Sequence, residues 1–80
     1  MKNRYYKLDN NSVFWEYIPE ERKRISVKLY NFSTNIEIDN TDDEYSGSIK
    51  NIRLSDKQEF DSAYNKALEL ISNKQLNSYE

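Results

Sequence analysis

Cations and aromatic rings alternate through the first 30 residues, and this mixture is the chain's clearest sign of a binding surface. Arg4 and Lys7 flank two tyrosines, and Lys28 precedes Tyr30 by two residues. Aromatic rings supply contact area in protein interfaces and stack on bases, while cations follow a phosphate backbone. The candidate binding residues are Tyr5, Lys7, Trp15, Tyr17, Lys28 and Tyr30.

The composition argues against catalysis. The chain has no histidine and no cysteine, so it lacks the commonest general base, a thiolate nucleophile, a disulfide and the usual zinc ligands. Carboxylates are plentiful, but 80 residues leave little room for a deep cleft that shifts their pKa values. The single glycine excludes a glycine-rich phosphate loop. We expect a non-enzymatic protein with no cofactor and no catalytic or metal-ligating residues.

An acidic segment at residues 39–44 contains oxygen ligands of the kind that Ca²⁺ and Mg²⁺ prefer. Its spacing lacks the glycine at the sixth position and the glutamate at the twelfth that an EF-hand loop requires. We interpret this segment as a solvated loop, and the sequence leaves cation binding there open.

The sequence also bears on cellular location. No apolar run approaches the length of a membrane span, and the charged start at Met1-Lys2 has no apolar run after it. Lys, Asn, Ile, Tyr and Phe, which have A/T-rich codons, account for 35 of the 80 residues. We therefore expect a protein from a low-GC bacterium or phage, without a membrane partner. Its expected location is the cytoplasm, or the host cytoplasm if a phage encodes it.

A β-hairpin is predicted at the start of the chain. Residues 4–8 and 13–18 are rich in strand-forming aromatic and aliphatic side chains. Residues 9–12 between them are Asp, Asn, Asn and Ser, which favour turns. Pro19 cannot donate to a sheet ladder and ends the second strand.

Strict alternation predicts a third strand at residues 25–30, with Ile25, Val27 and Leu29 on one face. After Leu29 the alternation of apolar and polar residues shifts by one position, so that Tyr30, Ile36 and Ile38 share a parity. Either residues 31–35 form a turn, which their Asn, Ser and Thr content favours, or one long strand carries a bulge. Further strands are predicted at residues 36–39 and 48–54.

An amphipathic helix is predicted at residues 56–74. Ser55 and Gln58 match a capping box, in which Ser55 caps the helix. The residues that follow form one apolar stripe at helical spacing: Phe60, Ala63, Tyr64, Ala67, Leu68 and Ile71.

These elements predict an α+β fold in one domain covering residues 1–80. A small antiparallel sheet of three to five strands, connected as a meander, precedes one C-terminal helix that packs on one sheet face. The helix leaves the other face uncovered. Because neighbours on a strand alternate, either Phe14 or Trp15 points to that face, and parity does not say which.

An uncovered aromatic sheet face predicts binding to another protein, as an inhibitor, regulator or adaptor, or to a second copy in a homodimer. The alternative is a domain that binds single-stranded nucleic acid through the same aromatic and basic face. The net charge of −2 favours the protein partner, because nucleic-acid-binding domains are usually basic.

Overall fold

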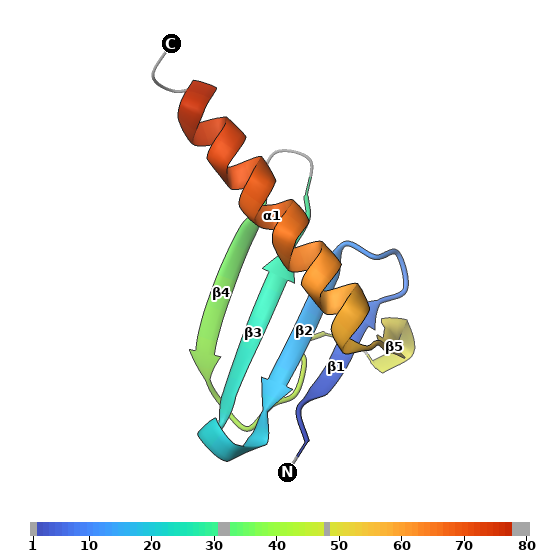
Figure 1. Ribbon diagram of the computed structural model, residues 1–80. Coiled ribbons are helices and arrows are strands. Elements are labelled where there is room, and N and C mark those ends of the chain that lie inside the picture. The colour runs from blue at the N-terminus through green and yellow to red at the C-terminus, as the bar shows by residue number, and fades with distance from the viewer. Residues whose placement is uncertain (1, 31–32, 48, 78–80) are drawn as a thin grey trace.

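A computed structural model describes residues 2–30, 33–47 and 49–77, with side chains of the last helix described as far as residue 72. Five strands precede one long helix, and two short 3₁₀ helices lie in the connections (Figure 1). In chain order the elements are β1 (Arg4–Leu8), β2 (Val13–Ile18), η1 (Pro19–Glu21), β3 (Lys23–Lys28), β4 (Asn35–Asn40), η2 (Ile49–Asn51), β5 (Ile52–Leu54) and α1 (Lys57–Asn77).

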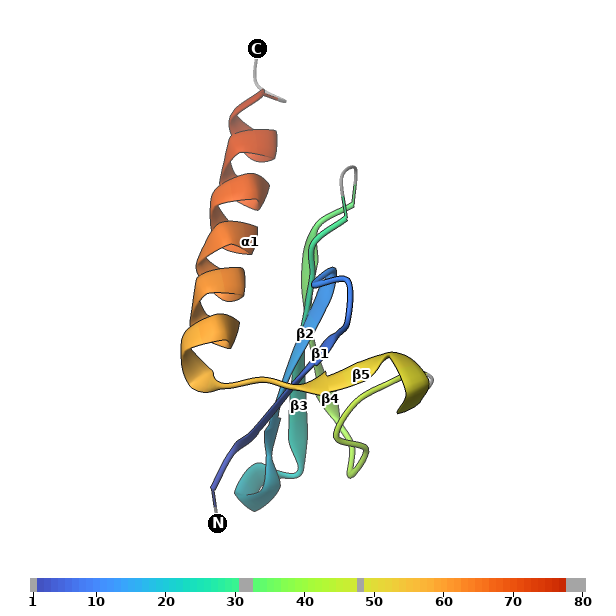
Figure 2. The same ribbon diagram turned by 90° about the vertical axis from the view of Figure 1, so that its right-hand side faces the viewer.

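The strands form one antiparallel sheet in the order β4-β3-β2-β1-β5, and α1 packs on one face, which confirms the predicted α+β fold. The first four strands are a meander. The fifth strand departs from it, because β5 pairs with β1 rather than with β4. The connection from β4 to β5, described at residues 41–47 and 49–51, therefore passes from one edge of the sheet to the other, on the side opposite α1 (Figure 2).

The first hairpin has the predicted strands. Its turn is built by asparagines, since Asn11 has a positive φ of 59° and the Asn10 side chain accepts a hydrogen bond from the Ser12 amide (3.0 Å). Asparagine tolerates this left-handed backbone and bonds its own chain, so the turn residues act as the sequence indicated.

The phase flip after Leu29 results from a connection between two strands, not from a bulge in one strand. β3 and β4 are separate and pair antiparallel from Lys23↔Asn40 to Lys28↔Asn35. The Thr34 hydroxyl donates to the Tyr30 carbonyl (3.0 Å) within this connection, whose residues 31 and 32 lie outside the described part of the chain. The predicted strand at 36–39 is extended by one residue at each end, and that at 25–30 begins and ends two residues earlier.

The predicted strand at 48–54 is too long. Only Ile52–Leu54 is extended, and Ile49–Asn51 forms a 3₁₀ turn, while residue 48 is outside the described residues. The Asp9 amide donates to the Asn51 carbonyl (2.8 Å) at the point where β1 ends. Strand pairing stops there because β1 has no further extended residue to offer.

The core lies between α1 and one face of the sheet. Phe60, Ala63 and Ala67 of the helix are buried against Phe14 and Val27. Half-buried side chains surround this centre, among them Ile25 and Leu29, so the predicted helix-facing residues of the third strand are confirmed. Phe14 faces the helix and Trp15 the opposite side.

The helix is capped by Asp56 and not by Ser55. The Asp56 carboxylate accepts a hydrogen bond from the Glu59 amide (2.8 Å), whereas the Ser55 hydroxyl bonds the Glu59 carboxylate (3.1 Å). The Ser55 amide donates to the Tyr5 carbonyl (3.0 Å), which keeps Ser55 in the extended segment before the helix. The predicted cap is therefore one residue too early.

Replacing the cap should destabilise the protein. We expect Asp56→Ala to lower the free energy of unfolding by about 1 kcal/mol, since the Glu59 amide loses its acceptor. Ser55→Ala should cost less, because it leaves that amide bonded. Urea denaturation of both variants measures the difference, and a larger loss from Ser55→Ala would contradict this cap.

Candidate functional site

The six candidate binding residues do not share one surface. Strand alternation places Tyr5 and Lys7 on the helix side of the sheet and Trp15, Tyr17 and Lys28 on the opposite side. Tyr30 follows β3 and is 44% exposed. The two N-terminal candidates are therefore separated from the other four by the thickness of the sheet.

Tyr5 and Lys7 serve the packing of the helix. The Tyr5 ring contacts Phe60 with centroids 5.8 Å apart, and its hydroxyl donates to the Glu16 carboxylate (2.9 Å). Lys7 Nζ pairs with Glu59 in the first turn of α1 (2.7 Å). Burial, together with the hydrogen bond to Glu16, raises the pKa of Tyr5 to about 12.

The connection from β4 to β5 covers the aromatic face opposite the helix. The Tyr45 ring lies against Tyr6 (centroids 5.1 Å apart) and Trp15 (6.4 Å). The Glu44 carboxylate accepts hydrogen bonds from the Tyr6 hydroxyl (2.5 Å) and from Arg4. One aromatic and one acidic residue thus hold this connection on the sheet.

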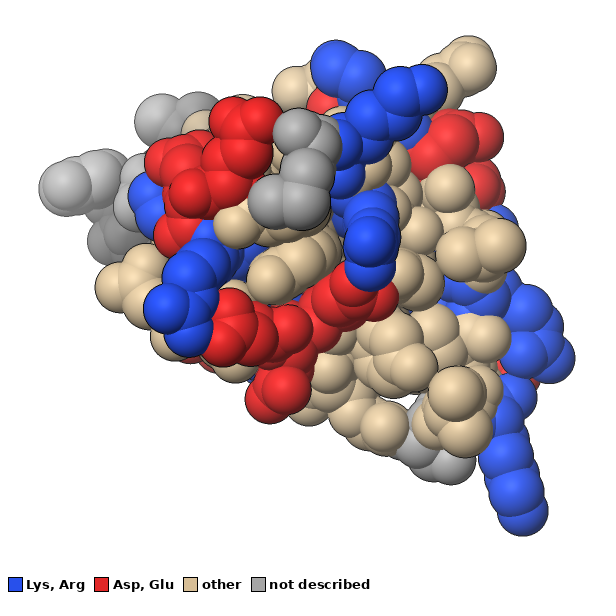
Figure 3. Space-filling model, turned by 90° about the horizontal axis from the view of Figure 1, so that it is seen from below, with Lys and Arg blue, Asp and Glu red and all other residues tan. Residues whose placement is uncertain are grey.

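The expectation of an uncovered aromatic face is therefore wrong. Trp15 is 3% exposed and Tyr17 8% exposed. The physical cause is the placement of β5 beside β1, which forces the preceding segment across the sheet. Buried rings offer no stacking surface for bases. Seen from the end that carries η1, acidic and basic side chains are interspersed and form no continuous basic field (Figure 3).

A pocket of about 240 Å³ remains on this covered face. It brings together three of the candidate residues with three that the sequence did not single out. The six are Trp15, Arg24, Ser26, Lys28, Tyr30 and Glu37. Since Trp15 and Ser26 are buried, the pocket reaches down to the sheet itself.

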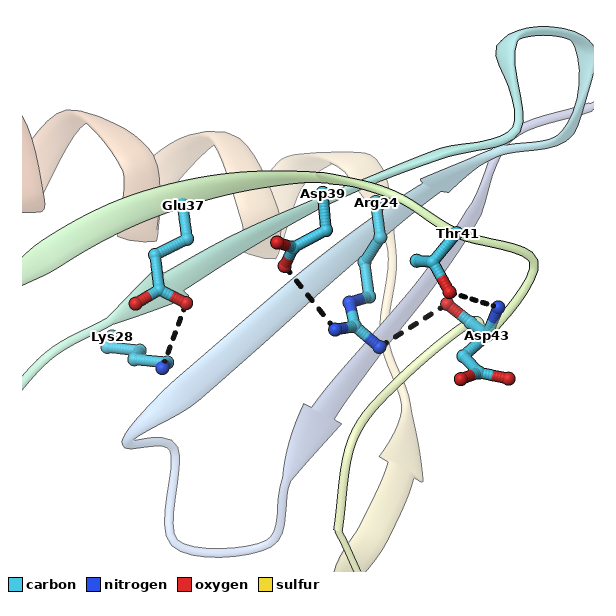
Figure 4. A network of polar contacts seen from close by, with 6 residues as sticks. All are labelled: Arg24, Lys28, Glu37, Asp39, Thr41 and Asp43. Atoms are coloured by element: carbon cyan, nitrogen blue, oxygen red, sulfur yellow. Dashed lines mark hydrogen bonds and ion pairs between the residues drawn. The ribbon is translucent and has the colours of Figure 1, made fainter.

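Charged side chains of β3 and β4 alternate beside the pocket (Figure 4). Lys28 Nζ bonds Glu37 (3.1 Å), and Arg24 Nη2 lies 3.4 Å from Asp39. Arg24 Nη1 donates to the Asp43 carbonyl at the same distance, 3.4 Å. The Arg24 side chain is 14% exposed, and its Nε is buried without a hydrogen-bond partner.

The helix side of the sheet is only partly covered. α1 crosses the sheet diagonally and leaves the end of β4 and the start of β3 free (Figure 1). The cross-strand row of Phe14, Val27 and Ile36 lies in or against the core. In the next row Ile25 is half-buried and its partner Ile38 is 63% exposed.

β4 is also an edge strand, with no strand described on its outer side. The Thr41 amide donates to the Arg22 carbonyl (3.0 Å), and antiparallel pairs alternate between bonded and non-bonded. Glu37 and Asp39 therefore direct their backbone groups toward β3. The N–H and C=O groups of Ile36, Ile38 and Asn40 point outward. We call these groups, with the side chains of Ile25 and Ile38, the β4 edge surface.

The acidic segment does not gather its carboxylates. Asp42 forms a two-point pair with Arg22 (2.7 and 2.5 Å), which lowers the pKa of the aspartate. Glu44 faces Arg4 and Tyr6 instead. Within the described residues no three acidic side chains converge as metal ligands would. Nor does any described helix combine the length and the apolar character that a bilayer span requires.

The sequence did not single out Arg24, Ser26, Ile38 and Tyr45. Arg24 stands in a charged run, which indicates a solvated turn, and Ser26 alternates with aliphatic residues as an exposed strand residue does. Tyr45 offered one signal, since an aromatic residue within an otherwise polar segment needs something to pack against. Its partner strands cannot be identified from the sequence alone.

Comparison of the chain with protein-family models, with curated proteins and with solved structures yields no match.

Removing the ring that covers Trp15 should expose the tryptophan. We expect Tyr45→Ala to shift Trp15 emission to longer wavelength and to increase its quenching by acrylamide, because solvent reaches the indole. Ile49→Ala changes a residue that is 73% exposed in the same connection and should leave both unchanged. Equal quenching of Tyr45→Ala and wild type would contradict a covering role.

The raised pKa of Tyr5 predicts a loss of stability in alkali. Above its ordinary value of 10 the unfolded chain releases the Tyr5 proton, whereas the folded chain holds it to about pH 12. The free energy of unfolding should thus fall as pH rises through this window. Tyr5→Phe should show a smaller fall in urea denaturation than Tyr30→Phe, the exposed control. Equal slopes would contradict the buried environment of Tyr5.

Proposed function

We propose that this chain is a non-enzymatic protein-binding module that uses the β4 edge surface. The carrying observation is a six-residue edge strand, unpaired on its outer side among the described residues, beside an isoleucine that is 63% exposed. An extended segment of a partner can add to such an edge through backbone hydrogen bonds, with side-chain contacts giving specificity. The lack of histidine and cysteine supports a binding role rather than catalysis.

Strand β4 lacks the usual protection of an edge. Proteins block edge pairing with prolines, lysines or bulges, and Asn35–Asn40 contains none of the three. Its two acidic side chains could repel a guest strand. However, Glu37 and Asp39 each pair with a cation of β3 (3.1 and 3.4 Å), which neutralises much of that repulsion.

The charge pattern favours a different protein over a second copy. In a two-fold antiparallel pairing of two β4 strands, Glu37 would face either Glu37 or Asp39 of the other copy. Like charges directly opposite each other destabilise a sheet. A guest strand with apolar side chains toward Ile38 and neutral or basic ones toward Glu37 avoids this cost.

The homodimer, the low-GC bacterial or phage origin and the cytoplasmic location stay predictions. The nucleic-acid alternative also stays untested, and no described surface favours it, because Trp15 and Tyr17 are buried.

Substitution at the edge should abolish partner binding without unfolding the chain. Ile38→Lys places a charge on the β4 edge surface and should change the free energy of unfolding by no more than about 0.5 kcal/mol, as exposed sites usually do. In pull-downs from nuclease-treated lysate of the native host, we expect wild type to retain a partner that Ile38→Lys loses.

Leu54→Lys is the matched control, since Leu54 is 82% exposed on the opposite edge strand. It should retain the partner. Equal retention by all three proteins would refute the β4 edge surface. A partner that disappears on nuclease treatment would support the nucleic-acid alternative instead.

A further inference from the structure

We propose that the pocket beside Trp15 binds a small organic carboxylate through Arg24, Ser26 and Lys28. This pocket lies on the sheet face opposite the helix, whereas the exposed Ile38 side chain lies on the helix side. The pocket is therefore a separate site from the β4 edge surface. Arg24, Ser26 and Lys28 bring more N–H and O–H donors to it than their contacts with Asp39, Asp43 and Glu37 use.

Arg24 supplies the largest share of that excess. A guanidinium carries five N–H groups. The contacts of Arg24 with the Asp43 carbonyl and the Asp39 carboxylate use one N–H on each terminal nitrogen, both at 3.4 Å, which is long for a hydrogen bond. Its Nε has no partner and is buried. A ligand in the pocket does not reach the buried Nε, so the donors that Arg24 offers are the remaining N–H groups of its two terminal nitrogens.

Lys28 and Ser26 add donors on the same strand. The Lys28 ammonium has three protons, and its described contact is with Glu37 (3.1 Å). That pair is weak because both side chains are partly exposed, at 32% and 45%. Ser26 is 2% exposed and lines the pocket with a hydroxyl that can donate one hydrogen bond. Because residues two apart on a strand point to the same face, Arg24, Ser26 and Lys28 all lie on the pocket side of the sheet.

The walls of the pocket define the rest of the ligand. Half-buried Leu8 and the exposed ring of Tyr30 supply apolar surface, whereas Val13 and Trp15 are each 3% exposed and lie at the bottom of the pocket. Arg24 and Lys28 each pair with a carboxylate of β4, so it is the number of their N–H donors and not a net charge that favours an anionic acceptor. A hydrated inorganic ion would leave the apolar walls unused. A volume of about 240 Å³ instead suits a carboxylate on a short apolar or aromatic body.

Trp15 is the chain's one tryptophan and lines the pocket, so its fluorescence reports binding directly. We expect phenylacetate to give a saturable change and the neutral phenylacetamide to give none. The C-terminus of a peptide is a second source of a carboxylate. A short peptide that ends in phenylalanine tests it, with the C-terminally amidated peptide as control. Response to phenylacetate alone assigns a free acid, and response to both assigns a peptide terminus as well.

Lys28→Gln should weaken phenylacetate binding roughly tenfold, which is the usual worth of a hydrogen bond from a charged group. Lys57→Gln makes the same charge change at an exposed helix residue and should bind like wild type. Ile38→Lys should also bind like wild type, which separates this site from the β4 edge surface. Thermal melting verifies that each variant is folded.

Three results would overturn the proposal. The first is no saturable response to either carboxylate probe at millimolar concentration. The second is an equal response to the carboxylates and their amides, which would indicate apolar contact only. The third is equal binding by Lys28→Gln and Lys57→Gln, which would show that Lys28 does not bind the carboxylate.

Discussion

The pairing of β5 with β1 is the contact on which both faces of this sheet depend. Only three residue pairs form it, from Tyr6↔Leu54 to Leu8↔Ile52, and a backbone hydrogen bond extends it at each end. Because β5 lies at the edge farthest from β4, the connecting segment has to cross the sheet. The helix begins three residues after β5 and therefore starts over β1 on the other side.

This one crossing explains which aromatic residues are available to a partner. Tyr45 and Glu44 of the crossing segment lie on Tyr6, Trp15 and Arg4. The rings that look like a binding surface in the sequence instead hold a connection in place. Meanwhile the diagonal path of α1 leaves Ile38 exposed on the side that a helix was expected to cover.

The cations of β3 connect the two proposed sites. Arg24 and Lys28 face the acidic side chains of β4, which reduces the charge of that edge. The same two cations line the pocket on the sheet face opposite the helix. A strand that alternates cations with buried aliphatic residues thus serves the core on one side and polar recognition on the other.

The sequence by itself determined the elements whose signals are local. Alternation of side chains, turn residues and the apolar helix stripe depend on neighbours within a few positions, so β1, β2, β3 and α1 follow from them. After β3 the sequence fitted both a turn and a bulge, and the pairing of β3 with β4 decided for two separate strands. The helix cap lies one residue later than predicted. Both Ser55 and Asp56 have a side chain that can accept a hydrogen bond from the first helical turn, but the Ser55 amide bonds the Tyr5 carbonyl and Asp56 caps the helix instead. Only the tertiary structure decided that β5 joins β1, that Tyr45 covers Trp15 and that Arg24 is largely buried. These contacts join residues far apart in the chain, and the energy that selects them comes from packing and desolvation, which leave no periodic trace in the sequence.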